Sequence, residues 1–196
     1  MDQDHPRRRR RHRRFSGEDR ISGLPDELLH SILLRLGSVR VAARSDALSC
    51  RWRHVWTRLP ELVFDSGSLD TPPPAPAASF ARAVDRTLAA YAADSDATLE
   101  GLVIVVPAAA GYVPAGRVAR WLRFAAGRVA GELVLFMPRP LGMRPDELEV
   151  LLHGASLELP ACERAKAIAL RLKLVWRLRL GPAGSFAALI SLTILL

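Results

Sequence analysis

The chain has 196 residues, 49% of them hydrophobic, and a formal net charge of +8. This size supports one moderate core, or a small module followed by a second unit. Its two cysteines, Cys50 and Cys162, offer neither a disulfide framework nor a metal-binding pattern, so we expect both to be small buried hydrophobes in a reducing compartment. The apolar runs 102–106 and 186–196 are too short to span a membrane, and the amino-terminal sequence lacks the apolar segment of a secretory signal.

The first segment of the chain is dominated by arginines, namely Arg7, Arg8, Arg9, Arg10, Arg11, Arg13 and Arg14. These side chains account for nearly all of the net charge of +8, so the remainder is almost neutral and has no specific nucleic-acid footprint. Because like charges repel and nothing here can be buried, we predict that residues 1–17 form a disordered tail. We interpret the run as a nuclear-import signal in a nuclear and/or cytoplasmic protein. A solvated tail or a non-specific polyanion contact are the alternatives.

Residues 24–36 predict an amphipathic helix. Apolar side chains recur on one helix face at three- and four-residue spacing, at Leu28, Leu29, Ile32, Leu33 and Leu36. Pro25 suits the first helical position, because its missing N–H would have no partner there, and Gly37 suits a left-handed C-terminal cap.

Residues 48–59 predict another helix, with one apolar face made by Leu48, Trp52, Val55, Trp56 and Leu59. Ser38 can cap a short helical turn over residues 39–44 between the two. Three helices in so short a segment lie near the lower size limit for independent folding, which is about 40 residues. Their apolar stripe therefore needs cover, either from the rest of this chain or from another protein.

This helical segment contains a specific sequence pattern. In chain order its residues are Leu24-Pro25, Glu27, Leu28, Ile32, Leu36, Leu48-Ser49, Trp52-Arg53 and Trp56. In these positions residues 19–65 resemble the F-box, and most closely that of the plant family that joins it to leucine-rich repeats. The resemblance implies docking on the Skp-type adaptor of a cullin-based (SCF-type) ubiquitin ligase. The chain would then be a non-catalytic substrate-recognition subunit without a cofactor, and its target protein is unknown.

The resemblance also implies which residues contact the adaptor. Carried over by position, they are Leu24, Pro25, Leu28, Ile32, Leu33, Trp52, Arg53, Val55 and Trp56. For any one of them, a place in the core of the three helices is as good an expectation as a place in the interface, because one stripe serves both purposes. Asp46 and Cys50 differ from the residues that the family usually has at these two positions. No arrangement of residues predicts a catalytic or metal site, since the five histidines are scattered.

Residues 66–78 are rich in proline and alanine, and predict a linker between an F-box at 18–65 and a second region at 79–196. In the second region, helical faces are predicted over 80–92 and 118–126. Strands are predicted at 99–106, 132–137, 167–172, 176–180 and 192–196, with a helical turn or a strand at 146–152. The nearly continuous apolar run 99–106 is typical of a strand that is covered on both faces.

Strands that alternate with connectors at roughly 20- to 35-residue spacing indicate an irregular repeat solenoid, with an ordinary α/β domain as the alternative. Leu189, Leu192 and Ile194 resemble leucine-rich-repeat spacing, and the family resemblance favours such repeats. We therefore predict an α+β protein: a small three-helix F-box module followed by an irregular α/β leucine-rich-repeat solenoid fragment. The last apolar strand has no capping repeat behind it, so we expect a shortened product. The rival hypothesis is a non-ligase interaction or decoy protein, or a non-functional fragment.

Overall fold

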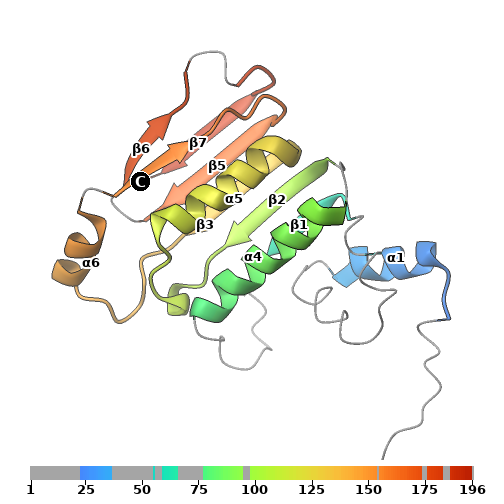
Figure 1. Cartoon of the computed structure of the whole chain (residues 1–196), viewed down its shortest axis with the longest axis horizontal. Coiled ribbons are helices and arrows are strands. Elements are labelled where there is room, and N and C mark those ends of the chain that lie inside the picture. The colour runs from blue at the N-terminus through green and yellow to red at the C-terminus, as the bar shows by residue number, and fades with distance from the viewer. Residues whose placement is uncertain are drawn as a thin grey trace, which may run out of the picture.

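The structure is a computed structural model that describes residues 23–36, 55, 59–65, 77–94, 98–153, 155–173, 176–182 and 186–195. The described part mixes helices and strands, as the predicted α+β class requires (Figure 1). Its helices are α1 (Asp26–Leu36), α4 (Ala77–Asp94), α5 (Ala115–Arg128) and α6 (Pro145–Leu152), with a 3-10 turn η1 (Ala108–Ala110). Its strands are β1 (Glu61–Phe64), β2 (Leu99–Val105), β3 (Val129–Met137), β4 (Ser156–Leu159), β5 (Ala167–Leu172), β6 (Arg177–Leu180) and β7 (Ser191–Leu195).

The strands form two parallel sheets, a five-stranded one in the order β1-β2-β3-β5-β7 and a two-stranded one of β4 and β6. The order in the larger sheet is the order along the chain. Between neighbouring strands the chain returns through α4, then α5, then α6 and β4, and finally β6. The helices α4 and α5 lie side by side over one face of the larger sheet, and β4 lies next to α5 (Figure 1). The body therefore has two layers.

The core lies between these layers and repeats from strand to strand. Parallel pairing places Leu62 beside Leu102, Leu102 beside Leu133, Leu133 beside Ile168, and Ile168 beside Leu192. The first four of these side chains are buried, whereas Leu192 is 39% exposed. A second buried column, two residues further along each strand, starts at Phe64 and Ile104. Each strand thus covers the apolar side chains of its neighbour.

The helix layer supplies the other half of the core from the faces that periodicity predicted. Helix α4 buries Phe80, Val84, Leu88 and Tyr91, and α5 buries Val118, Trp121, Leu122 and Ala125. Both helices extend a few residues beyond the predicted ranges 80–92 and 118–126. These two helix predictions are confirmed.

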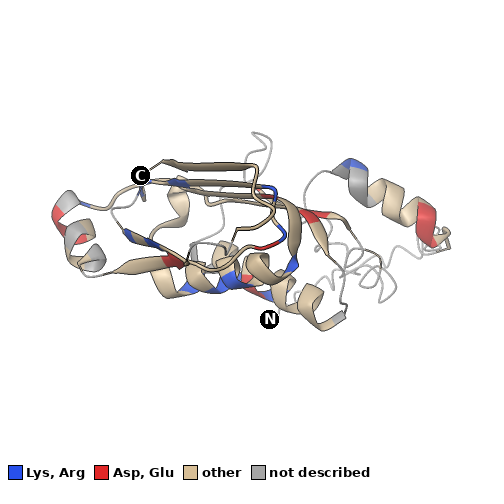
Figure 2. Cartoon of the chain, turned by 90° about the horizontal axis from the view of Figure 1, so that it is seen from above, with Lys and Arg blue, Asp and Glu red and all other residues tan. Residues whose placement is uncertain are grey.

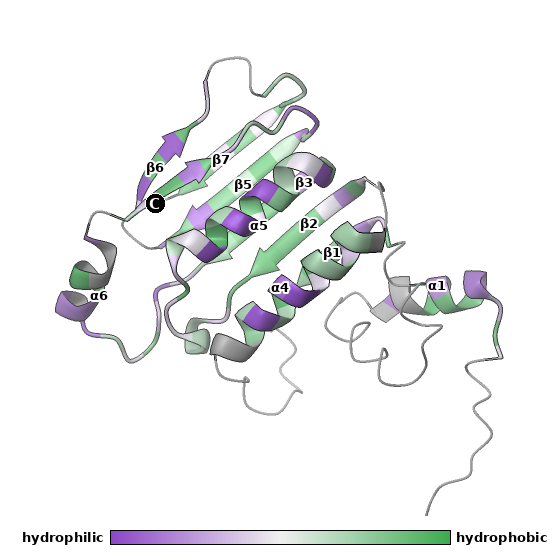
Figure 3. Cartoon of the chain, in the orientation of Figure 1, coloured by the Kyte–Doolittle hydropathy of each residue, from purple (hydrophilic) through white to green (hydrophobic). Residues whose placement is uncertain are grey.

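The expectation that residues 99–106 are covered on both faces is wrong. Burial alternates along the second half of β2: Leu102 and Ile104 are buried, and Val103 and Val105 are only half-buried. The reason is that α4 and α5 cover one face of the sheet only. In Figure 3 the strands of the larger sheet are mostly hydrophobic, although one of their faces is open in the described part of the chain.

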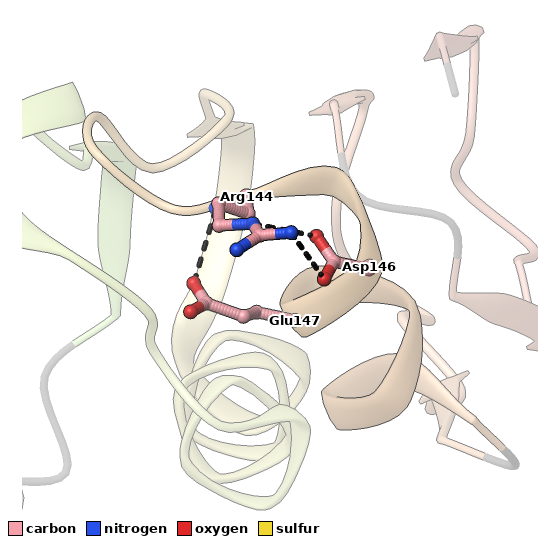
Figure 4. A network of polar contacts seen from close by, with 3 residues as sticks. All are labelled: Arg144, Asp146 and Glu147. Atoms are coloured by element: carbon pink, nitrogen blue, oxygen red, sulfur yellow. Dashed lines mark hydrogen bonds and ion pairs between the residues drawn. The ribbon is translucent and has the colours of Figure 1, made fainter.

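The other predicted strands, at 132–137, 167–172, 176–180 and 192–196, are confirmed as β3, β5, β6 and β7. The ambiguous segment 146–152 is the helix α6, which begins with Pro145. The Arg144 backbone N–H donates to Glu147 Oε2 over 3.1 Å, and Arg144 Nε donates to Asp146 Oδ1 over 3.2 Å (Figure 4). These contacts satisfy polar groups at the helix start, where the N–H groups have no partner within the helix.

Two strands, β1 and β4, were not predicted. Strand β1 lies inside the range 18–65 that was assigned to the F-box, and α4 begins inside the range 66–78 that was assigned to the linker. The predicted short helix at 39–44, most of the predicted helix at 48–59 and the arginine run lie outside the described residues. Cys50 also lies outside them, and Cys162 is buried as expected.

One glycine of the sheet gives a test of this fold. The pairing of β2 with β3 is irregular between Leu99 and Gly101, and a Cβ at Gly131 would collide with the Glu100 carbonyl oxygen. Because backbone cannot rotate away as a side chain can, we expect Gly131→Ala to lower the free energy of unfolding by about 1–3 kcal/mol or more in urea denaturation.

The matched control is Gly127→Ala in the last turn of α5, where an added Cβ meets no atom within 4 Å. Alanine favours a helix over glycine by about 0.5–1 kcal/mol, so this variant should be unchanged or more stable. Equal stabilities of the two variants would contradict the tight approach of β3 to β2.

Candidate functional site

Helix α1 lies outside the two-layer body, near the edge that β1 forms (Figure 1). Leu29 is fully buried, and it packs with Val55 and Leu59, which are each 4% exposed. The half-buried Leu24, and Ala90 of α4, pack against this cluster. Within the described residues, this cluster of three buried side chains joins α1 to the body.

The chain just before β1 is also tied to α4 by a polar contact. The Tyr91 hydroxyl of α4 donates to the Leu59 carbonyl oxygen over 3.4 Å. Burial raises the pKa of the Tyr91 phenol, and the positive charge of Arg128 lowers it by a smaller amount. The phenol therefore stays protonated and can keep donating this hydrogen bond through the physiological pH range.

The other side of α1 presents apolar side chains to solvent. Leu28 is 51% exposed and Ile32, one turn further along, is 38% exposed. Pro25 precedes Leu28 by about one turn and is exposed, and its carbonyl oxygen accepts backbone hydrogen bonds from Leu28 and Leu29 at 3.1 Å. Single exposed hydrophobic residues are common on protein surfaces, but these follow one another along one side of a helix. We refer to Pro25, Leu28 and Ile32 as the α1 ridge.

A hollow of 180 Å³ adjoins the helix and is lined by Asp26, Glu27, His30 and Val55. His30 Nε2 is buried there and has no hydrogen-bond partner in the described part of the chain. Ser31 Oγ donates to the Glu27 carbonyl oxygen over 2.8 Å, so the polar side of α1 is partly satisfied within the helix. The surroundings of α1 are thus an apolar ridge next to an acidic first turn.

The structure divides the predicted adaptor contacts. It brings Pro25, Leu28 and Ile32 together on the exposed side, leaves Leu24 half-buried, and buries Val55 behind the helix. Trp52, Arg53, Trp56 and the side chain of Leu33 lie outside the described residues. Sequence periodicity treated Leu28 and Leu29 as one face, and only the packing separates the exposed residue from the buried one.

Two kinds of chemical site, a metal cluster and a reactive thiol, find no support among the described residues. Among the described residues, no group of His, Cys, Asp and Glu could hold a metal ion, and no helix is long and apolar enough to cross a membrane. Cys162 Sγ lies 3.3 Å from the Pro160 carbonyl oxygen, and burial raises the pKa of its thiol, which disfavours the reactive thiolate.

Comparison with known proteins identifies the class: the chain is similar to plant F-box proteins that carry leucine-rich repeats. F-box/LRR-repeat protein 25 of Arabidopsis thaliana is 49% identical over 47 residues, which are 24% of this chain and 18% of that protein. An F-box/FBD/LRR-repeat protein of the same plant is 57% identical over 49 residues, 25% of this chain and 11% of that protein. In Oryza sativa subsp. japonica, the MEIOTIC F-BOX protein MOF is 48% identical over 54 residues, 28% and 11% of the two chains.

The predicted resemblance to plant F-box/leucine-rich-repeat proteins is thereby confirmed. The similarity spans less than one fifth of the length of each of these three relatives. No family model matches the chain, and no solved structure matches it.

The division of α1 into two sides can be tested by stability alone. Leu29→Ala should lower the local stability of α1 by about 2–5 kcal/mol, or abolish the protection of its amides against hydrogen exchange, because it opens a cavity in a small cluster. Leu28→Ala, which truncates a neighbouring residue of the same type, should change it by no more than about 0.5 kcal/mol. Hydrogen exchange of the amides in residues 26–36 measures both values. Similar losses in the two variants would contradict the described orientation of α1.

Proposed function

We propose that the chain acts as a non-catalytic substrate-recognition subunit of an SCF-type ubiquitin ligase. One region would dock on the Skp-type adaptor and through it on a cullin, while another region binds the target protein. Ubiquitin transfer would then be promoted by proximity alone. The observation that carries the proposal is the apolar α1 ridge, exposed on a segment whose residues match the F-box pattern.

The chemistry of the ridge suits a protein partner. A few well-packed side chains in a desolvated centre supply most of the binding energy of an interface. Leu28 and Ile32 are already held on a helix, so little conformational entropy is lost when they are covered. In this proposal Leu29, Val55 and Leu59 support the ridge from behind, and Leu24 borders it. Trp52, Arg53, Trp56 and Leu33 remain proposed contacts.

The target would bind the body, which we propose to be an irregular solenoid of the leucine-rich-repeat type. The support is the strand order, which follows the chain, and the buried columns that begin at Leu62 and Phe64. The open face of the larger sheet is the surface available to a target. It places Val63, Val103 and Val134 in one row across three strands.

The arginine run at 7–14 is proposed to be a nuclear-import signal. Its charge density suits an acidic transport receptor, and no other segment of the sequence carries such a cluster. A protein with this signal would work in the nucleus as well as in the cytoplasm.

The test is binding of the full chain to a purified plant Skp-type adaptor, measured by calorimetry. The double variant Leu28→Ser and Ile32→Ser should bind at least about thirtyfold more weakly, which corresponds to the roughly 2 kcal/mol that one interface anchor contributes. The change removes apolar area from an exposed surface, so the fold should persist.

A matched control places the same substitutions elsewhere: Leu141→Ser and Val150→Ser change residues that are 69% and 77% exposed on the far side of the body. This variant should bind like the wild type. Equal binding by the wild type and the α1 double variant would reject the adaptor role of the ridge. Absence of binding in the wild type would favour the decoy or interaction-protein hypothesis.

A further inference from the structure

A third surface, distinct from the α1 ridge and from the open sheet face, lies between α4 and α5. A groove of 260 Å³ separates the two helices, and its apolar lining consists of Leu88, Ala89, Ala92, Trp121 and Phe124. Leu88 and Trp121 form its buried floor, and Ala89 and Ala92 are exposed. The groove exists because alanines, rather than larger residues, line the side that α4 turns toward α5.

The helices that form the groove run in the same direction and are fixed at both ends. At one end Asp85 Oδ1 accepts a hydrogen bond from Trp121 Nε1 over 2.7 Å, and Asp85 Oδ2 lies 3.2 Å from Arg117 Nε. Further along both helices, the rings of Tyr91 and Phe124 meet edge to face with centroids 6.2 Å apart. The groove is therefore preformed.

The charge on the two helices that form the groove is predominantly positive. Helix α5 contains four arginines and no acidic residue, and α4 contains two arginines and two aspartates. One of these aspartates, Asp85, is already engaged by Arg117 and Trp121. Figure 2 shows the resulting predominance of blue over red on these two helices.

Three of these arginines are exposed and form no ion pair within the described part of the chain: Arg86, Arg120 and Arg123. Arg120 lines the groove itself, and Arg123 follows it by one turn of α5. Arg86 precedes the groove residue Ala89 by one turn of α4. An apolar groove is thus bordered on both helices by positive charge that nothing in the described chain neutralises.

We propose that the groove between α4 and α5 binds an acidic amphipathic helix of a partner protein. Its apolar side chains, at the three- and four-residue spacing of one helix face, would lie over Ala89 and Ala92 against Phe124. Its carboxylates would pair with Arg120 and Arg123 on one border and Arg86 on the other. The axis of the bound partner helix would lie about 8–10 Å from the axes of α4 and α5, the usual distance for packed helices.

A helical protein segment fits this surface better than a nucleic acid. Phosphates would neutralise the arginines but leave the strip from Leu88 to Phe124 uncovered. An amphipathic helix satisfies both features, because its carboxylates flank an apolar face. The inference is independent of the adaptor, since the groove and the α1 ridge share no residue.

The test uses the full chain and a labelled designed peptide of about 18 residues, five helical turns, with leucines on one face and glutamates beside them. Fluorescence anisotropy should show saturable binding. Arg120→Glu with Arg123→Glu should weaken it at least about tenfold, because two attractive contacts become repulsive. The same exchange at Arg139 and Arg179, exposed outside these helices, alters the net charge equally and should change binding less than about twofold.

A steric pair of variants separates the groove from general charge attraction, including attraction to the arginine tail. Ala89→Gln places a longer neutral side chain in the groove, whereas Ala93→Gln places it on an exposed position of α4 outside the lining. Glutamine is a good helix former, so both variants should fold, and only the first should lose binding. Equal binding of a scrambled peptide, or of a single-stranded oligonucleotide with the same response to the variants, would overturn the proposal.

Discussion

The stacking of aliphatic side chains from one strand to the next is the interaction on which the body depends. Leu62, Leu102, Leu133 and Ile168 are each buried because the neighbouring strand places an equivalent residue beside them. A parallel arrangement in chain order needs a return segment after every strand, and the helices α4 and α5 serve this purpose while covering one face of the sheet. Within the described part of the chain the other face carries no covering layer, and we propose it as the surface for a target.

The helix α1 is governed by a different constraint. Its apolar contact with the described part of the body is a small cluster around Leu29, which covers one side of an amphipathic helix. Leu28 and Ile32 remain on the surface as a consequence. The same limited burial that makes α1 marginal as an independent unit makes it suitable as a docking element.

Long periodic segments could be predicted from the sequence, and short ones could not. The helices around residues 80–92 and 118–126 each repeat an apolar face over several turns, and this spacing of apolar residues indicates a helix rather than a strand. By contrast, β1 and β4 have four residues each, too few for alternation to be distinguished from chance. The helix α6 was ambiguous for the same reason, since eight residues with a proline start carry little periodic signal.

The candidate site was predicted as a set of residues but not as a surface. The order of the F-box pattern predicted a docking role for α1. The separation of Leu28 from Leu29 depends on which side meets Val55, a long-range contact that spacing cannot reveal. The same limit applies to β2, where Val103 and Val105 are only half-buried because the helix layer covers one face. The groove between α4 and α5 was missed because neither helix alone indicates it.

The central claim is that the exposed side of α1 is a docking surface, and hydrogen exchange of the full chain with a saturating Skp-type adaptor tests it most directly. Binding at that surface should stabilise the helix, so the amides of residues 26–36 should exchange more slowly in the complex, while those of β2 and β3 stay unchanged. A saturated complex in which the exchange of α1 is unaltered would contradict the account.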